Sequence, residues 1–454
     1  MPHIINTTLK PQIDIFKKSF LQFEDLPFND LFSADVIADI LEHTPQTRVS
    51  VFTPLVTLKA FIFQVFGDKS CKQAVAGVLA DRLADGKTAI TINTGPYCKA
   101  RQRLPLLPLV NAVTSVGLAL HQQTPNAWRW NGYNVVIADG TTVLMPDTPA
   151  NQAAFPQQEN QKPGLGFPIV RLVALISLAA GTVIAYSHAQ YQGKGTGETS
   201  LLSQLFGNLS VDDLLLADRY YCTFAIFALL LARGIQALIP LHANKKADFG
   251  KGVRLGSKDH LIEWEKPKRK PVWMSDQDYA ALTEKITVRE FSVNNMVYVT
   301  TMLDDKQFSK QDLAMLYKER WKIELDLRTI KTDMSMEMLR CKSPDSVLKE
   351  IAVHLLGYNI IRGNLAQAAS LYKKVPRQLS FKSAVQLVIQ FARQLVAATG
   401  AELAKISLSL LKAVASTAIG RQKRKSQPRA VKRRPKSFPL LTVPRNEACL
   451  ALVF

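Results

Sequence analysis

Short apolar runs typical of β-strands alternate with segments typical of helices between residues 134 and 239, and this alternation constrains the fold most. It indicates an α/β fold, in which helices flank a mixed sheet. The expected strands are residues 134–139, 142–145, 214–217 and 235–239, with a long hairpin over 169–189 and helices over 198–206 and 222–233.

Changes in sequence character divide the chain into expected domains. Residues 1–130 have a mostly helical pattern, and 131–370 contain the α/β alternation. A polar, Lys-rich stretch at about 241–305 ends in an alternating run, which predicts a β-rich insertion. C-terminal helices are expected over 371–420, followed by a basic tail at 421–454. A chain of 454 residues is too long for one ordinary core, so about two to four domains are expected.

A basic helix near the N-terminus leaves two interpretations open. Residues 70–85 have a helical pattern, and Thr94-Gly-Pro then opens a short helix that carries Lys99, Arg101 and Arg103. Two helices with a basic second member are typical of a helix-turn-helix that reads DNA. A plain helical bundle with a solvated basic face has the same pattern.

The charge balance favours a phosphate-rich partner. The chain has 57 Lys and Arg residues against 37 Asp and Glu, a net charge of +20. Each cation that meets a nucleic-acid backbone releases condensed counterions, so the excess favours nucleic-acid binding over a merely basic surface. Residues 421–436 are mostly Lys or Arg, and such a run either forms a solvated tail or binds DNA phosphates.

Cysteine and histidine usage indicates neither a disulfide framework nor a zinc site. The five cysteines are scattered without a CxxC pair, which fits a reducing cytoplasm. The seven histidines show no ligand spacing, and no P-loop or dinucleotide fingerprint is present, so no nucleotide cofactor is expected.

No membrane segment is expected. The first 20 residues carry charges and lack the apolar core of a secretory signal. Residues 172–186 are too short for a span and contain a Gly-Thr turn, and residues 222–241 are interrupted by Arg233-Gly234. The sequence therefore predicts a soluble protein.

A helix expected from about Ser309 to Lys331 has two different faces. At 100° per residue, apolar side chains cluster on a face built to pack: Leu316, Ile323, Leu327 and Ile330. Within roughly a 100° sector elsewhere lie one carboxylate, three cations and two aromatic side chains. These residues, which we call the polar stripe, are Tyr317, Arg320, Trp321, Glu324, Arg328 and Lys331.

The polar stripe has a structural and a functional interpretation. A solvated helix face would use Glu324 and Arg328 as an i,i+4 ion pair. Exposed faces rarely need both a tyrosine and a tryptophan, which favours a site.

Two apolar strands each end in an aspartate. Asp139 closes NVVIAD before Gly140, and Asp218 closes DLLLAD before Arg219. A carboxylate there lies on a rigid element at the sheet edge where ligands gather, although each alone is also typical of a helix cap or turn. With Glu324 they supply three hard oxygen ligands suited to Mg²⁺. Two such ions about 4 Å apart activate a water or 3′-hydroxyl and stabilise the leaving oxygen in phosphodiester displacement.

The helix also carries a specific motif. Tyr317, Arg320, Glu324 and Lys331 fit the pattern Y-x(2)-R-x(3)-E-x(6)-K within YKERWKIELDLRTIK. With IADGTT and LLADRYY before it in the correct order, the chain resembles bacterial insertion-element transposases of insertion sequence family four, which are of the DDE class. The resemblance spans about residues 131–370, and NTGPYCKARQRLP and the basic tail resemble that family more loosely.

The resemblance implies a ribonuclease-H-like catalytic domain with a β insertion before the acidic helix. It implies a transposase that cuts and joins DNA with two Mg²⁺ ions, for which Mn²⁺ is expected to substitute. Asp139 would bridge both ions, Asp218 would hold one and Glu324 the other.

The resemblance also implies the partners. These are double-stranded DNA, as terminal inverted repeats and target, and a second copy of the chain on paired ends, in the bacterial cytoplasm with the nucleoid. Cations would hold phosphates, and an aromatic side chain would stack on an extruded base. The candidate DNA-binding residues are Tyr317, Arg320, Trp321, Arg328, Lys331, Arg219, Lys99, Arg101 and Arg103.

One departure leaves the hairpin intermediate of some relatives open. Those relatives insert a tryptophan from the strand before the acidic helix, where this chain has Met296 with Tyr298 nearby. Trp264 and Trp273 lie elsewhere in the insertion and fit a core equally well.

Two other functions stay open. A host-adopted descendant would bind DNA without cutting it, which the three intact acids argue against. A stand-alone nuclease of the same fold, such as a resolvase or ribonuclease, would need only the acidic core, without the insertion, the helical N-terminal region and the polar stripe.

Overall fold

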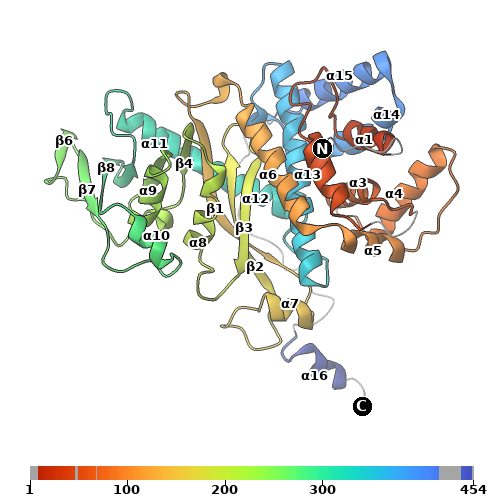
Figure 1. Cartoon of the computed structure of the whole chain (residues 1–454), viewed down its shortest axis with the longest axis horizontal. Coiled ribbons are helices and arrows are strands. Elements are labelled where there is room, and N and C mark those ends of the chain that lie inside the picture. Colours follow the sequence, from red (N-terminus) through yellow and green to blue (C-terminus); the bar gives the residue numbers. More distant parts are fainter. Residues whose placement is uncertain (1–8, 46–49, 68, 419–440, 452–454) are drawn as a thin grey trace, which may run out of the picture.

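The computed structural model describes residues 9–45, 50–67, 69–418 and 441–451, and its centre is a nine-stranded sheet (Figure 1). The strand order is β3-β2-β1-β4-β5-β9-β8-β7-β6. The strands are β1 (Asn134–Leu144), β2 (Ile169–Ser177), β3 (Val183–Gln190), β4 (Asp213–Leu216), β5 (Gln236–Pro240), β6 (Val253–Gly256), β7 (Asp259–Glu265), β8 (Lys285–Val293) and β9 (Met296–Thr300).

The pairing directions define the fold. Strand β4 pairs in parallel with β1 on one side and with β5 on the other. Strands β2 and β3 form an antiparallel hairpin that continues the sheet beyond β1. Three parallel strands next to such a hairpin are the arrangement of a ribonuclease-H-like domain. The expected fold class, a mixed sheet flanked by helices, is confirmed.

The strands of the β-rich stretch extend the same sheet, because β9 pairs antiparallel with β5. Beyond β9, a buried ion pair holds the outer strands together. Arg289 on β8 donates to Asp259 on β7 at 2.7 and 2.8 Å and to the carbonyl of Phe308 at 2.7 Å. The stretch also contains α10 (Asp276–Ala281).

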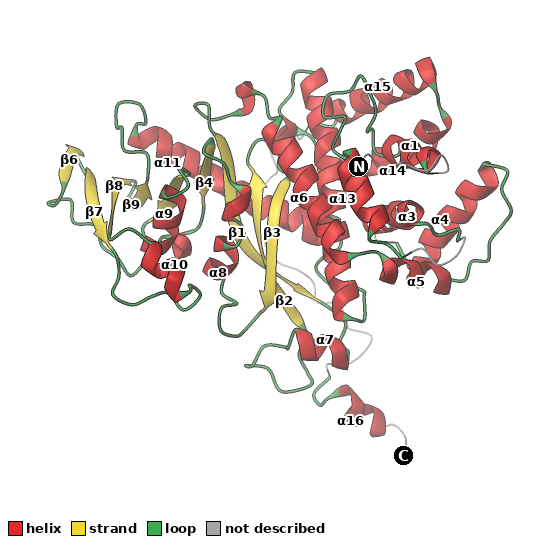
Figure 2. Cartoon of the chain, in the orientation of Figure 1, coloured by secondary structure: helices red, strands yellow, loops and turns green. Residues whose placement is uncertain are grey.

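Helices cover both faces of the sheet (Figure 2). On one face, Val135 and Ile137 of β1 join a core shared with α6 (Leu106–Gln122) and α13 (Pro344–Leu371). On the other, Val136 and Ala138 join a core shared with α8 (Glu198–Ser203) and α9 (Phe224–Leu231). Side chains of a strand alternate between faces, so β1 contributes to both cores.

Helices of the N-terminal region and helices that follow α13 pack into the first of these cores together. Phe61 on the N-terminal side and Leu410 on the C-terminal side both belong to it. The N-terminal helices are α1 (Lys10–Lys18), α2 (Ala34–Glu42), α3 (Pro54–Phe66), α4 (Cys71–Ala84) and α5 (Gly95–Arg103). The remaining ones are α7 (Pro149–Ala154), α14 (Phe381–Ala397), α15 (Gly400–Ser416) and α16 (Arg445–Leu450), of which α14 and α15 pack with α13.

The connection between α4 and α5 favours the bundle interpretation of the N-terminal region. Residues 85–94 separate the two helices, whereas a helix-turn-helix joins its helices through about three to four residues. Both helices instead pack on α3.

Two elements differ from their expected form. Strand β1 runs without a break through Gly140 to Leu144, because β2 pairs with it along this whole length, so Asp139 lies inside the strand rather than at its end. The expected helix over 309–331 is divided into α11 (Lys310–Lys318), a 3-10 turn at Glu319–Trp321, α12 (Lys322–Arg328) and a π-helical turn at Thr329–Asp333.

Two expectations concern other parts of the chain. The basic run 421–436 lies outside the described residues. In the described part of the chain, no single helix has the length and apolar character of a membrane span, although α5 and α6, bent by 72°, pass such a test as a pair.

Candidate active site

Asp139 and Asp218 lie at the same level of neighbouring parallel strands. The last residue pair between β1 and β4 is Ile137 with Leu216, so each aspartate follows two residues beyond that pair. Strand β4 ends there while β1 continues, so in the described structure the β4 side of β1 has no strand partner from Asp139 to Val143, until Leu144 bridges Met338. The two acids therefore lie at one edge, as expected, although Asp139 lies inside β1 and Asp218 lies two residues after the end of β4.

Each aspartate accepts a backbone hydrogen bond that fixes its side chain. Asp139 Oδ1 accepts from the amide of Gly140 at 2.8 Å. Asp218 Oδ1 accepts from the amide of Tyr220 at 3.2 Å and caps the 3-10 turn Arg219–Tyr221. The second oxygen of each carboxylate remains free of a backbone amide in the described structure.

Glu324 on α12 reaches the same place through Arg320. The Arg320 guanidinium lies 3.3 Å from Asp139 Oδ2 and 3.0 Å from Glu324 Oε1. The i,i+4 pair of this helix is therefore Arg320 with Glu324, and among the described residues Arg328 forms no ion pair with Glu324. Arg320 lies in the 3-10 turn Glu319–Trp321, directly before α12.

The electrostatics of the site centre on Asp139. Burial raises the pKa of its carboxyl from 3.8 to about 6, and the nearby carboxylates of Glu198 and Asp218 add to this rise. The Gly140 amide and the Arg320 guanidinium act in the opposite direction without cancelling it. Burial thus outweighs the contact with Arg320 in setting the pKa of Asp139.

The side chains at this edge offer the type of ligand atom that a divalent cation binds. Asp139, Asp218 and Glu324 offer carboxylate oxygens, which Mg²⁺ prefers, and their mutual repulsion would be relieved by a cation. Among the described residues, however, no three acidic, histidine or cysteine side chains are gathered closely enough to hold an ion as they stand. Arg320 takes the place of a cation between Asp139 and Glu324.

The packing face of the helix is confirmed, and the polar stripe divides into inner and outer residues. Leu316, Ile323, Leu327 and Ile330 are buried. The inner stripe residues are Tyr317 and Arg320, since Tyr317 Oη donates to the carbonyl of Ala217 at 3.2 Å, next to Asp218. Burial raises the pKa of Tyr317, so the hydroxyl stays protonated. Trp321 and Arg328 are exposed and Lys331 is half-buried. Arg219, which follows Asp218, is also exposed.

The three basic residues of α5 have different environments. Lys99 is exposed and Arg103 is half-buried. Arg101 points inward, because its guanidinium stacks 3.8 Å from the Phe61 ring centroid and donates to Cys341 Sγ at 2.9 Å. These contacts give Arg101 a packing role, so we leave it out of the candidate DNA interface.

Sequence analysis missed Glu198 and Tyr221. Glu198 opens α8, and Tyr221 Oη donates to its Oε2 at 3.2 Å. The only sequence signal for Glu198 was an acid after a Gly-rich turn, which is also typical of an ordinary helix start. Nothing in the sequence brought it next to Asp139.

The aromatic residues of the insertion, and Met296, contact different parts of the molecule. Tyr298 on β9 lies edge-on to Tyr317, with ring centroids 5.3 Å apart, and so touches the polar stripe. Met296 packs against the first core. Trp264 and Trp273 pack against the second core, which fits the core interpretation, and Trp264 Nε1 donates to Glu290 at 2.8 Å.

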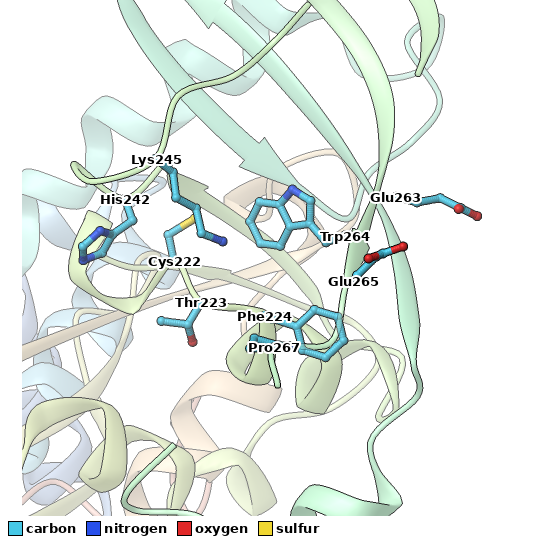
Figure 3. A pocket seen from close by; sticks show the side chains of 9 residues that line it. All are labelled: Cys222, Thr223, Phe224, His242, Lys245, Glu263, Trp264, Glu265 and Pro267. Carbon is cyan, nitrogen blue, oxygen red and sulfur yellow. The ribbon is translucent and has the colours of Figure 1, made fainter. Parts of the chain in front are cut away.

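A pocket of about 440 Å³ lies between the start of α9 and β7 (Figure 3). Trp264 and Phe224 form its apolar part, and Lys245 stands over the Trp264 ring at 4.2 Å. Its lining includes none of the three acids, so the candidate site is the open sheet edge and not this pocket.

A family model and a curated relative give this chain the same description. The profile of the family described as Transposase DDE domain matches residues 130–360. A curated relative, Transposase InsG for insertion sequence element IS4 of Escherichia coli (strain K12), is 28% identical over 363 residues, which cover 78% of this chain and 79% of the relative. A solved structure, the piggyBac transposase synaptic complex with hairpin DNA, is 11% identical with a TM-score of 0.45 and covers 89% of this chain and 85% of that chain.

Proposed function

This chain belongs to the Transposase DDE domain family and is a transposase, and from that premise we propose that it cuts DNA at the ends of an insertion element and joins the 3′ ends to target DNA. The observation that supports this most is the convergence of three acids. Arg320 pairs with both Asp139 and Glu324, and the charge of Asp218 raises the pKa of Asp139.

The chemistry is a pair of phosphodiester displacements. In the first, water attacks a phosphorus at the element end, and the released 3′ oxygen takes up a proton. In the second, that 3′-hydroxyl loses its proton and bonds to a target phosphorus, while the target's own 3′ oxygen leaves and is protonated. The number of phosphodiester bonds is conserved in the joining step, so no nucleotide cofactor is needed.

Asp139, Asp218 and Glu324 would hold the divalent cations, with Mg²⁺ as the expected ion and Mn²⁺ as a substitute. Bound there, such cations activate the attacking oxygen and stabilise the leaving one. Asp139 borders the open side of β1 and would face both reacting oxygens, whereas Asp218 and Glu324 approach from β4 and α12.

Arg320 has two successive roles in this proposal. In the DNA-free chain it neutralises Asp139 and Glu324. When DNA and cations enter, its guanidinium would turn to a DNA phosphate, for which its planar donors are well suited. The binding of DNA and the binding of cations are thus expected to favour each other.

The DNA path would follow the residues around this edge. Trp321 is 59% exposed, which leaves its ring available to stack on a base. Arg328, Lys331 and Arg219 supply cations for phosphates, and Lys99 extends the basic surface onto α5. Paired element ends would require two copies of the chain, and DNA binding would keep them with the nucleoid.

A joining assay tests this function. Full-length protein is incubated in Mg²⁺ with a duplex that carries the inverted repeats flanking the coding region and with a plasmid target. We expect cleaved ends whose 3′ strand becomes covalently linked to the plasmid. Cleavage without joining would indicate a nuclease, and binding without cleavage would indicate a host-adopted protein.

A further inference from the structure

The site has a second glutamate that the transposase motifs do not include. Glu198 opens α8, on the sheet face opposite to α12. A side chain at position 140 would point toward the α8 face, because neighbouring residues of β1 face opposite sides of the sheet. A Cβ built on Gly140 would lie 2.6 Å from the Glu198 carboxyl carbon and from Oε1. The Glu198 carboxylate therefore lies directly against the backbone that carries Asp139.

A hydrogen bond links Glu198 to the same edge. Its donor, Tyr221, ends the 3-10 turn Arg219–Tyr221, which Asp218 caps. Glu198 and Glu324 thus approach Asp139 from opposite faces of the sheet.

Its hydrogen bonding leaves one oxygen available. Tyr221 Oη donates to Oε2 at 3.2 Å and orients the carboxylate. In the described part of the chain, no hydrogen bond reaches Oε1 and no Lys, Arg or His lies within ion-pair distance of Glu198. Glu198 is therefore a half-buried carboxylate with one oxygen that can accept a cation from outside.

We propose that Glu198 is a fourth carboxylate of this catalytic site and supplies a further oxygen ligand for the divalent cation, with Tyr221 orienting it. The inference rests on the proposed function, because it assumes that Asp139 holds a cation. Gly140 is then required next to Asp139, since a side chain there would push the Glu198 carboxylate away.

Mn²⁺ binding to the full-length, DNA-free protein tests the inference. Titration is followed by the electron paramagnetic resonance signal of free Mn²⁺, and a thermal melt of each variant checks its folding. We expect Glu198→Gln to weaken Mn²⁺ binding by about ten-fold or more at an unchanged melting temperature. The matched control is Glu402→Gln, since Glu402 is also an acid in the first turn of a helix but lies on α15. Its Mn²⁺ affinity should equal that of the wild type.

Two more variants separate a ligand from a packing residue. Tyr221→Phe removes the hydrogen bond and keeps the carboxylate, so it should weaken Mn²⁺ binding less than Glu198→Gln. Gly140→Ala displaces the end of a flexible side chain, so it should reproduce the weaker binding while the protein stays folded. If Tyr221→Phe equals Glu198→Gln, or Gly140→Ala has no effect, Glu198 acts through packing and the inference is overturned.

Asp139→Asn in the same titration distinguishes this inference from the proposed function. Loss of Mn²⁺ binding in Asp139→Asn together with wild-type binding in Glu198→Gln would overturn the role of Glu198 alone. Wild-type binding in both variants, or no Mn²⁺ binding by the wild type, would overturn the proposed metal site and this inference with it.

Discussion

At the scale of single residues, the protonation of Asp139 is coupled to the fold. Its folded-state pKa of about 6 lies above the unfolded value of 3.8 because burial and neighbouring carboxylates disfavour its charge. The folded chain therefore binds this proton more tightly than the unfolded chain does. The associated stability is present below about pH 4 and is lost as the pH rises through about 6.

This predicts a pH-dependent effect of Asp139→Asn, which mimics the neutral carboxyl. In metal-free buffer, the free energy of unfolding of the variant should gain about 2 kcal/mol relative to the wild type between pH 4 and pH 7. Urea denaturation of both proteins at the two pH values measures this. A difference that does not change with pH would mean that Asp139 ionises as freely in the folded chain as in the unfolded one.

The three motif acids could be predicted from sequence, but their surroundings could not. Asp139 and Asp218 were found because each stands at the end of an apolar run. Glu324 was found because it lies in a helical motif with fixed spacing. The ion-pair interpretation of the stripe named the wrong partner for Glu324, because Arg320 and Arg328 are both four residues away and Arg328 was chosen. In the structure Arg320 pairs with Glu324 and also with Asp139 on β1. Only the three-dimensional fold reveals Glu198, because its neighbour Gly140 is remote in sequence.

At the scale of elements, α12 is held by a buried charge network on the side away from the site. Asp326 accepts from Arg362 on α13 at 2.6 Å, from Arg377 at 2.8 Å and from Tyr358 Oη at 3.0 Å. Two arginines and a tyrosine thus fix α12, which carries Glu324 two residues earlier.

Removing the Asp326 charge should destabilise the whole fold. Asp326→Asn leaves two buried guanidinium groups without their anion, so we expect a loss of about 3 to 5 kcal/mol in the free energy of unfolding. Asp30→Asn is the control, because Asp30 pairs with Lys17 at an exposed position and should contribute at most about 1 kcal/mol. Equal effects of both substitutions in urea denaturation would show that the network does not anchor α12.

Element boundaries were least predictable where tertiary pairing overrides local preference. Separate strands were expected over 134–139 and 142–145, but β2 pairs with β1 past Gly140 and makes one strand as far as Leu144. The helical period over 309–331 correctly identified the packed face, yet the 3-10 and π-helical turns within it leave the pattern of apolar residues unchanged and so gave no sequence signal.

At the scale of the whole molecule, the net charge of +20 is the feature that acts over the longest range. Deletion of residues 421–454, which contain the basic run, should weaken binding to all DNA sequences alike and flatten the salt dependence, because fewer phosphates are neutralised. The measurement is the slope of log affinity against log salt concentration for cognate and random duplexes. An unchanged slope would mean that the run stays in solvent, and a loss confined to the cognate duplex would mean that it reads sequence.

Cleavage of element-end DNA in Mg²⁺ by three charge-removing variants tests the central claim most directly. The claim is that Asp139, Asp218 and Glu324 together hold the catalytic cations. Asp139→Asn, Asp218→Asn and Glu324→Gln should each slow cleavage by about 1000-fold or more, since several kcal/mol of transition-state stabilisation is lost, while binding to the end stays close to wild type. Near-normal cleavage by any one of the three would show that its carboxylate holds no catalytic cation and would contradict the account.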